Sequence, residues 1–391
     1  MKRKVSIVFI TGLILVLGIK ATFTKRCDFN TSYRFGKLVV EGSDIYGNTA
    51  RDGLSAHQLY PPFYAVLMVP FTFLERTRAK FAWFVLDMVC LVLAVRLSAR
   101  LILGKDHSSP PKYFYLLPVV MTARFFINNL VHGQVNIMLF FMVIASLCLY
   151  SEGKDVLSGI LLGLAASVKL TPLLFIVYSL YKGRFKVFIG SVIALAVFFV
   201  LPGFVFSFPR YFIYVGEWYS QVMSVTFTGR VSTIIFNQSM PAAIYRLFSS
   251  VDLNTARYFV LLLELVLLAL ILCFSRAKTG RKDGRLCLEY SLVFIGCLLM
   301  PPVSNKASFV SLFFPYMAIV HHFLKTVPGD AVLKWLLAGS FLLNTLTAEF
   351  LGSRLSDFFE GNSCITAGTL LLLCAILRAL SVKSVSPVEP E

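Results

Sequence analysis

Apolar segments long enough to cross a bilayer recur along the chain, and shorter polar segments separate them. A transmembrane helix needs about 20 consecutive, mostly apolar residues. The pattern therefore predicts an all-α fold, a polytopic bundle of transmembrane helices with about 11–13 spans. The candidate spans are residues 5–23, 81–103, 114–131, 135–150, 156–181, 187–206, 258–274, 288–303, 307–324, 331–346 and 363–380.

Prolines and polar residues interrupt two of the apolar segments. The tetrapeptide "KLTP", residues 169–172, divides the span at 156–181, so we expect two shorter helices that meet there. In "YPPFYAVLMVPF", residues 60–71, Pro61 and Pro62 remove backbone donors and favour an extended entry. Non-helical backbone at membrane depth occurs only where it is buried in protein or lines a wet cavity. We interpret this segment as the wall of a cavity, and the alternative is an ordinary helix with proline in its first turn.

The composition agrees with a membrane protein and leaves no room for a large soluble domain. Of the 391 residues, 57% are hydrophobic and only 15% are charged, whereas a soluble domain carries about 25% charged residues. We therefore predict one integral membrane domain over residues 1–391, with helices at 331–380 and a short polar tail at 381–391.

The positive charge is distributed as in a membrane protein. The formal net charge is +17, but Lys and Arg collect in short loops between apolar segments, as in the cytoplasmic loops of membrane proteins. A nucleic-acid-binding protein would gather them on one soluble face, so we expect membrane lipids and no nucleic acid as partners. The N-terminus is then cytoplasmic, and the polar loops at about 24–60 and 207–257 are external. The basic segment "ERTRAK", residues 75–80, is the exception to this orientation.

The sequence contains no pattern of metal ligands. The eight cysteines show no ligand spacing, and the acidic residues lack the paired spacing of a divalent-cation site. We therefore expect neither a metal nor a cofactor.

Polar residues inside apolar segments are the candidates for function, because they are costly there and usually functional. Most of them fall toward the external side, which predicts an outward-facing cavity lined by an acid, cations, and amide or imidazole donors. Asp87 and Glu264 are expected to pair within the bundle or to lie near an interface, without a catalytic role. The full set is Asp28, Asp87, Arg124, Asn128, Asn129, His132, Gln134, Asn136, Lys169 and Glu264.

Five motifs carry a resemblance to a known family. In order they are "CDFNTSYRFGKLVVEGSDIYG", "YPPF", "GQVN", "GLAASVKLTPLLFIVYSLYKGRFK" and "FNQSMPAAIYRLF". Together they resemble glycosyltransferase family 87, polyprenol-phosphate-sugar-dependent enzymes of the GT-C type, from about residue 28 to about residue 325.

The resemblance implies a catalytic cavity at the extracytoplasmic face of the cell (inner or cytoplasmic) membrane. It also implies transfer of a sugar, mannose or arabinofuranose, from a polyprenyl-phosphate donor to a glycolipid or polysaccharide acceptor. In such enzymes an acid early in the first external loop is the general base, which here is Asp28; Asp44 and Asp52 are nearby alternatives.

Inverting transfer assigns roles to the remaining candidates. One carboxylate takes the proton of the acceptor hydroxyl, and the phosphate leaves as an anion, so cations and donors near it stabilise the developing charge. Lys169 is the first candidate for that contact. The other candidates for donor phosphate or sugar are His132, Gln134, Asn136, Arg124 and Arg246, and those for acceptor or loop contacts are Asn237, Gln238, Ser239, Tyr46, Tyr60 and Lys306.

One departure and one alternative accompany this hypothesis. Many family members carry a late loop with tryptophan and histidines, whereas residues 300–309 read "MPPVSNKASF", so Lys306 takes the place of a histidine contact. The alternative function is a transporter or flippase of a lipid-linked sugar, since broken helices and an intramembrane cation also suit transport. A transporter should show repeated halves, and the sequence shows no clear internal repeat.

Overall fold

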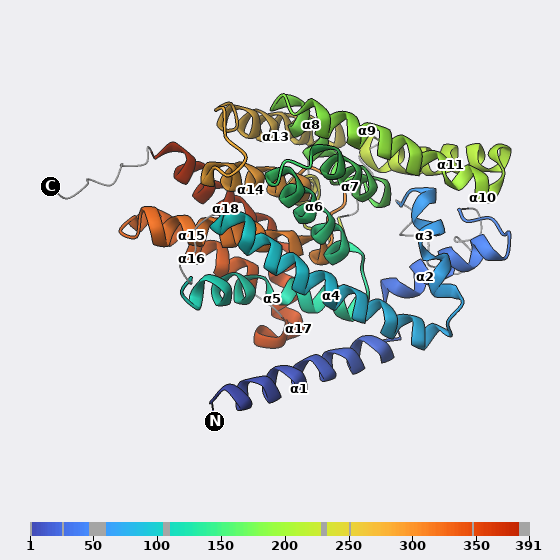
Figure 1. Cartoon of the computed structure of the whole chain (residues 1–391), viewed down its shortest axis with the longest axis horizontal. Coiled ribbons are helices and arrows are strands. Elements are labelled where there is room, and N and C mark those ends of the chain that lie inside the picture. Colours follow the sequence, from blue (N-terminus) through green and yellow to red (C-terminus); the bar gives the residue numbers. More distant parts are fainter. Residues whose placement is uncertain are drawn as a thin grey trace. The chain divides into compact units, whose positions relative to one another are not determined.

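The computed structural model describes residues 2–25, 27–46, 60–104, 110–227, 233–249, 252–345 and 348–382. Helices make up the regular structure of this part (Figure 1), which confirms the predicted all-α fold. The one strand-like feature in the described ranges is an isolated antiparallel bridge between Asn237 and Asn305. In chain order the helices are α1 (Lys2–Phe23), α2 (Asp28–Val40), α3 (Pro62–Thr72), α4 (Arg76–Leu103), α5 (Tyr113–His132), α6 (Asn136–Ser151), α7 (Asp155–Val168), α8 (Leu173–Tyr181), α9 (Phe185–Val200), α10 (Pro202–Phe206), α11 (Phe208–Phe227), α12 (Met240–Leu247), α13 (Leu253–Phe274), α14 (Gly284–Leu299), the 3-10 helix η2 (Lys306–Leu312), α15 (Phe313–Thr326), α16 (Ala331–Thr345), α17 (Ala348–Gly361) and α18 (Cys364–Ser381).

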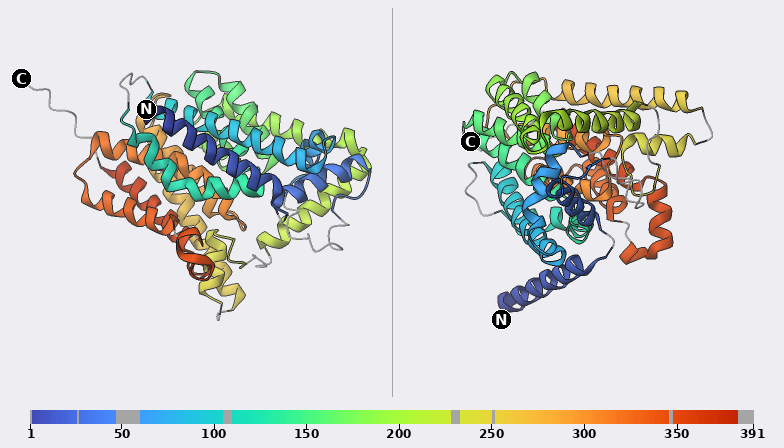
Figure 2. Two further views of the ribbon diagram at one scale, coloured as in Figure 1. Left: turned by 90° about the horizontal axis from the view of Figure 1, so that it is seen from below. Right: turned by 90° about the vertical axis from the view of Figure 1, so that its right-hand side faces the viewer.

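The chain divides into two compact units. Unit 1 consists of Met1–Leu97 and Phe125–Arg230, and unit 2 of Ser98–Arg124 and Val231–Glu391. In unit 2 the orange and red helices α16 and α18 pack side by side (Figure 2). The assignment of the whole chain to one domain stays a prediction.

Apolar helices identify the chain as a multi-pass membrane protein. Within the described ranges, six helices are long and apolar enough to cross a membrane, and shorter apolar helices such as α3, α6, α7 and α16 accompany them. The total of about 11–13 spans stays a prediction. The six long candidates are Arg76–Leu103, Tyr113–His132, Phe185–Phe206, Leu253–Phe274, Lys306–Thr326 and Cys364–Ser381.

The structure contains one of the two predicted interruptions. Lys169 is extended (φ −153°, ψ 136°) and separates α7 from α8, as the "KLTP" segment predicts. Pro61 is also extended (φ −62°, ψ 158°), but helix α3 begins at Pro62. The local conformation is therefore the alternative, a helix with proline in its first turn. With 11 residues, α3 is about 16 Å long, shorter than the roughly 30 Å of bilayer hydrocarbon. Its place in a cavity wall stays a prediction.

The two segments expected to be polar loops contain helices. Residues 24–60 include α2, and residues 207–257 include α11, α12 and the start of α13. Helix α2 forms because its apolar side chains follow helical spacing, and it buries Phe29, Tyr33 and Leu38 while Lys37 stays exposed. Polar residues on the opposite face hide such a helix from a search for continuous apolar segments.

Helices α7 and α9 approach each other so closely that their backbones touch. A Cβ atom on Gly159 would lie 2.4 Å from the carbonyl oxygen of Val187, and one on Gly163 would lie 2.4 Å from that of Ser191. The Gly-x-x-x-Gly spacing places both glycines on one face of α7, which is how small residues bring membrane helices together. This contact anchors the end of α7 immediately before Lys169.

The close contact predicts a stability effect for Gly163→Ala. The added methyl group must displace backbone, and we expect destabilisation of about 1–3 kcal/mol, the usual range for overpacking. Thermal unfolding in detergent measures it. Gly216→Ala is the matched control, because no atom lies within 4 Å of a Cβ at that helical position of the same unit. Equal melting temperatures for the two variants would contradict the close contact.

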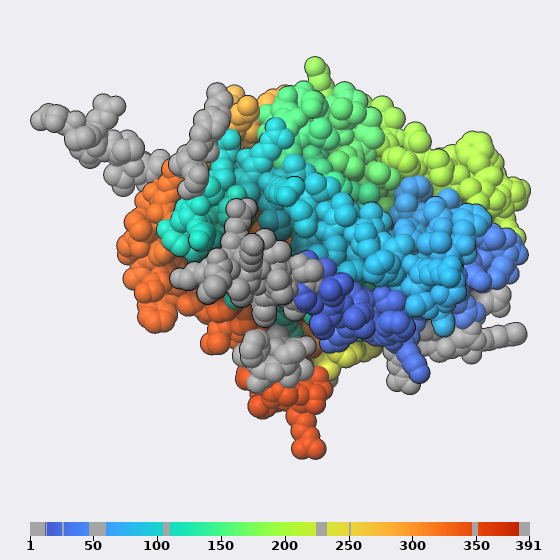
Figure 3. Space-filling model, turned by 60° about the horizontal axis from the view of Figure 1, so that its bottom comes forward, coloured from blue at the N-terminus to red at the C-terminus, as the bar shows by residue number. Residues whose placement is uncertain are grey.

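An apolar groove runs between α1 and α4 in unit 1. It has a cavity volume of about 660 Å³ and is lined from α1 by residues such as Leu15 and Ile19, and from α4 by residues such as Phe84 and Val89. In the space-filling view the blue surface of α1 lies against the cyan surface of α4 (Figure 3). The groove is uniformly apolar, so its lining suits hydrocarbon rather than water.

Candidate active site

Asp28 is the first residue of helix α2. The preceding Cys27 is extended (φ −152°, ψ 155°), so the helix begins at the acid itself. A carboxylate in the first turn interacts favourably with the positive end of the helix dipole. Asp28 is half-buried, so the helix start favours a negative charge on a side chain that is partly shielded from solvent.

The "GQVN" loop is held against the start of α2. Helix α5 ends at His132, the next residue Gly133 has φ +62°, and α6 begins at Asn136. A Cβ on Gly133 would lie 2.8 Å from the Cβ of Phe29. Glycine therefore serves twice here, because it adopts the left-handed conformation and leaves space for α2. The result is that Gln134 reaches Asp28.

Four predicted site residues form one hydrogen-bonded chain. Gln134 Nε2 donates to Asp28 Oδ2. Asn136 Nδ2 donates to Gln134 Oε1 over 2.8 Å, and Lys169 Nζ donates to Asn136 Oδ1 over 2.9 Å. We call Lys169–Asn136–Gln134–Asp28 the polar chain. It brings together the start of α2, the α5–α6 loop, the start of α6 and the break between α7 and α8.

The polar chain has a consistent direction. Its ammonium group lies at one end and its carboxylate at the other, and every donor points toward the carboxylate. Hydrogen bonds aligned in this way polarise and strengthen one another inside a protein. Such a site can hold a carboxylate in a fixed orientation for proton abstraction, and it offers a positive charge at its other end to an anionic group.

Of the two predicted tyrosines in this region, Tyr60 lies near Asp28, and Tyr46 contacts Tyr60. Tyr60 stacks on Tyr64 with ring centroids 4.3 Å apart, and Tyr46 Oη donates to the carbonyl oxygen of Tyr60 over 2.8 Å. Burial raises the pKa of the Tyr60 phenol well above its usual value, and the negative charge of Asp28 raises it further. Tyr60 is therefore neutral at physiological pH and can donate a hydrogen bond beside the acid.

The alternative acids differ in position. Asp44 lies beyond the C-terminal end of α2, where its Oδ1 accepts the backbone N–H of Tyr46 over 2.9 Å. Asp28 is at the opposite end of this 13-residue helix, a separation of about 20 Å along the axis. Asp52, the other alternative, lies outside the described residues. Of the two acids that the structure describes, Asp28 is the one in the polar chain.

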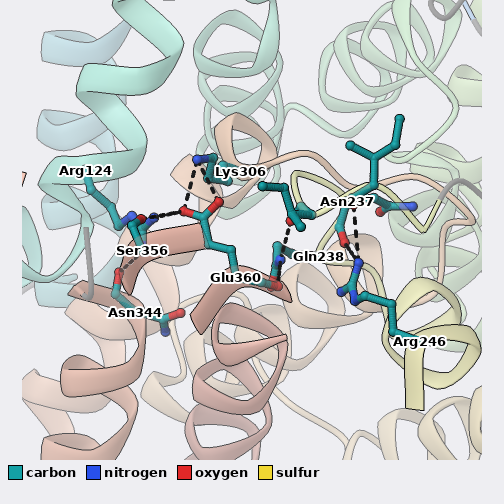
Figure 4. A network of polar contacts seen from close by, with 10 residues as sticks. Arg124, Asn237, Gln238, Arg246, Lys306, Asn344, Ser356 and Glu360 are labelled. Carbon is teal, nitrogen blue, oxygen red and sulfur yellow. Dashed lines mark hydrogen bonds and ion pairs between the residues drawn. The ribbon is translucent and has the colours of Figure 1, made fainter. Parts of the chain in front are cut away.

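A second polar network lies in unit 2 and centres on Glu360 (Figure 4). Glu360 Oε1 accepts from Arg124 Nη2 over 2.7 Å, and Lys306 Nζ lies 3.0 Å from Oε1 and 2.9 Å from Oε2. The side chain of Glu360 is 1% exposed, and those of Arg124 and Lys306 are 10% and 19% exposed. Two positive charges thus share one buried carboxylate. The sequence predicted a donor contact for Arg124 and an acceptor or loop contact for Lys306, and it gave no role to Glu360. Both substrate contacts stay predictions.

The predicted site residues Asn237, Gln238 and Ser239 form hydrogen bonds with backbone groups of unit 2. Asn237 Nδ2 donates to the carbonyl oxygen of Pro302 over 2.9 Å, and its Oδ1 accepts from the backbone of Ser304 over 2.9 Å. Gln238 Nε2 donates to the carbonyl oxygen of Glu360 over 2.8 Å, and Ser239 caps α12. These hydrogen bonds hold the loop before α12 in place. Contact of these three residues with an acceptor stays a prediction.

Arg246 belongs to the same unit as that loop. Its Nη2 donates to Ser363 Oγ over 2.7 Å, and its Nη1 donates to the carbonyl oxygen of Asn237 over 2.8 Å (Figure 4). Arg246 therefore joins α12 to the turn before α18, and its predicted contact with the donor is not tested by these bonds. Among the residues that the structure describes, no three His, Cys, Asp or Glu side chains gather as metal ligands; the expectation of a metal-free reaction stays a prediction.

The fold and the polar chain define a class of protein: a polytopic helical membrane protein with a positioned carboxylate at a helix start. The model of glycosyltransferase family 87 matches residues 59–301, which is more than half of the chain. The chain belongs to this family, as the ordered motifs predict. The match includes Gln134, Asn136 and Lys169 and begins after Asp28, so the assignment of Asp28 rests on the motif resemblance and on the polar chain.

Similar proteins include mannosyltransferases and an arabinofuranosyltransferase. A polyprenol-phosphate-mannose-dependent alpha-(1-2)-phosphatidylinositol pentamannoside mannosyltransferase of Mycobacterium tuberculosis is 26% identical over 83% of this chain and 74% of its own length. A polyprenol-phosphate-mannose-dependent alpha-(1-2)-phosphatidylinositol mannoside mannosyltransferase of Mycolicibacterium smegmatis is 27% identical over 57% of this chain and 52% of its own. An alpha-(1->3)-arabinofuranosyltransferase of Corynebacterium glutamicum is 28% identical over 52% of this chain and 49% of its own. The chain thus spans about half to three quarters of these relatives. No solved structure matches it.

Proposed function

We propose that the chain is an inverting glycosyltransferase that uses a polyprenyl-phosphate-linked sugar. The donor sugar is mannose or arabinofuranose, the acceptor is a glycolipid or glycan, and the reaction takes place at the outer face of the membrane without a metal or cofactor. The observation that carries the proposal is the polar chain, which joins a cation to the acid of a family-87 protein. The names of the similar proteins support the donor and acceptor classes.

The reaction follows from the two ends of the polar chain. Asp28 accepts the proton of an acceptor hydroxyl, and the acceptor oxygen attacks the anomeric carbon on the face opposite the phosphate. The bond from that carbon to the phosphate oxygen breaks, its electron pair leaves with the polyprenyl phosphate, and the configuration inverts. Because the leaving group is already an anion, the reaction needs no general acid, and a fixed positive charge stabilises it.

Sugar transfer by the purified protein tests the proposal. We expect labelled mannose or arabinose to pass from its polyprenyl-phosphate donor to extracted membrane lipids, with inversion at the anomeric carbon by NMR. Folded protein that transfers neither sugar but moves the donor lipid across vesicle bilayers would replace the proposal with the flippase alternative. Retention of configuration would overturn the inverting mechanism.

Lys169→Met tests the cationic end of the polar chain. We expect kcat/KM for the donor to fall by about 10- to 100-fold, since hydrogen bonds to charged groups contribute about 1.5–3 kcal/mol. Initial rates at varied donor concentration measure the effect. Lys154→Met is the matched control, because Lys154 is an exposed lysine of the same unit that pairs with Glu152. An unchanged kcat/KM for Lys169→Met would remove the lysine from the donor site.

A further inference from the structure

Asp87 is a buried acid that the proposed reaction does not use. It lies in α4, a candidate membrane span, and is 1% exposed. An ionisable residue at such a position is costly and usually has a function. Its position in the sequence indicates no catalytic role, so its contacts in the structure decide what it does.

Asp87 holds an asparagine that in turn holds the "GQVN" loop. Asn129, which is fully buried in α5, donates from Nδ2 to Asp87 Oδ2 over 3.2 Å. The same Nδ2 donates to the carbonyl oxygen of Gln134 over 2.8 Å. In return, the backbone N–H of Gln134 donates to the carbonyl oxygen of Asn129 over 3.1 Å. Both backbone polar groups of Gln134 are therefore bound by one residue.

The consequence reaches the catalytic carboxylate in one more step. The side chain of Gln134 donates to Asp28 Oδ2, so a rotation of the Gln134 backbone would move the donor that orients Asp28. Asp87 sets the rotamer of Asn129 by accepting its second N–H. Without that acceptor, the amide of Asn129 can turn away from Gln134.

We infer that Asp87 is a positioning residue for the sugar transfer, because it fixes Asn129, which clamps the backbone of Gln134 and so orients the Asp28 carboxylate. The inference rests on the proposed function for its effect on rate. The clamp, which is the pair of hydrogen bonds between Asn129 and the backbone of Gln134, can be measured without sugar transfer.

Kinetics of two Asp87 variants test the role in catalysis. Asp87→Ala removes the acceptor, and we expect kcat to fall by about 10- to 100-fold, the scale of a misplaced catalytic group, with donor and acceptor KM nearly unchanged. Asp87→Asn keeps an acceptor oxygen and should restore most of kcat. Glu264→Ala, at another acid within an apolar span, is the control and should keep the wild-type rate. Equal losses in Asp87→Ala and Glu264→Ala would overturn the inference.

A double variant separates positioning from general packing. If Asp87 acts through Gln134, Asp87→Ala combined with Gln134→Ala should be no slower than Gln134→Ala alone. Additive losses would overturn the inference, because distant and independent sites add.

Hydrogen exchange measures the clamp directly. In Asp87→Ala the backbone amide of Gln134 should exchange faster than in the wild type, while amides in the α7–α9 contact keep their rates. Unchanged exchange at Gln134 would overturn the inference even if activity falls. A second outcome is that the wild type transfers no sugar while the Gln134 amide still exchanges faster in Asp87→Ala than in the wild type. That result would overturn the proposed function alone and would support the contact of Asn129 with the Gln134 backbone.

Discussion

Replacement of Asp28 by Asn should lower kcat by about 10²–10⁴-fold, because general-base catalysis contributes on that scale. Asparagine has nearly the same size and offers an oxygen to Gln134, so the loop geometry should survive while the base is lost. Initial rates with polyprenyl-phosphate mannose or arabinose, together with a melting curve, measure the two effects separately.

Asp44→Asn is the matched control for this experiment. Asp44 lies on the same segment but at the opposite end of α2, and we expect its variant to keep a near-wild-type rate. The reverse pattern, an active Asp28→Asn and an inactive Asp44→Asn, would transfer the role of base to Asp44.

Glu360→Gln should destabilise the protein by about 3–5 kcal/mol, the cost of breaking a buried ion pair from one side. The variant leaves Arg124 and Lys306 without the carboxylate that both contact. Denaturant or thermal unfolding in detergent measures the loss. Adding Lys306→Met to Glu360→Gln should recover part of the stability, because it removes one of the two positive charges.

A more exposed ion pair of the same unit provides the control for Glu360. Asp330 pairs with Arg378 over 2.8 Å, and the side chain of Arg378 is 41% exposed. Water screens such a pair, which therefore contributes less than a buried one. Asp330→Asn should therefore unfold near the wild-type temperature. If both variants unfold alike, the Glu360 network does not stabilise unit 2.

The polar chain was largely predictable from the sequence. Asp28, Gln134, Asn136 and Lys169 are polar residues in or beside apolar segments, and few such residues exist in a chain so rich in hydrophobic ones. The ordered motifs also indicated one cavity. The sequence did not predict how the residues connect, because the direction of each hydrogen bond depends on the left-handed Gly133 and on the packing of the loop against Phe29.

Glu360 was missed for two physical reasons. Its partner Arg124 is 236 positions away, and no local pattern encodes a contact at that separation. In addition, helix α17 alternates apolar and charged residues, "AEFLGSRLSDFFEG", so it does not form a continuous apolar segment. Helical spacing of Leu351, Leu355 and Phe359, four residues apart in each case, is the signal that indicates a helix there. Asp87 was visible in the sequence, but only its contact with Asn129 gives it a role.

The glycine contact between α7 and α9 has a consequence for motion. Side chains between helices usually change rotamer when the helices slide, but two touching backbones have no such freedom, so α7 and α9 must move as one body. Lys169 directly follows α7 and therefore travels with this pair. If the proposed lipid-linked sugar binds beside Lys169, the opening that admits it would require movement of helices outside this pair, such as the short helices α2 and α3. Asp28, at the start of α2, would then move, while Lys169 would keep its place relative to α7 and α9.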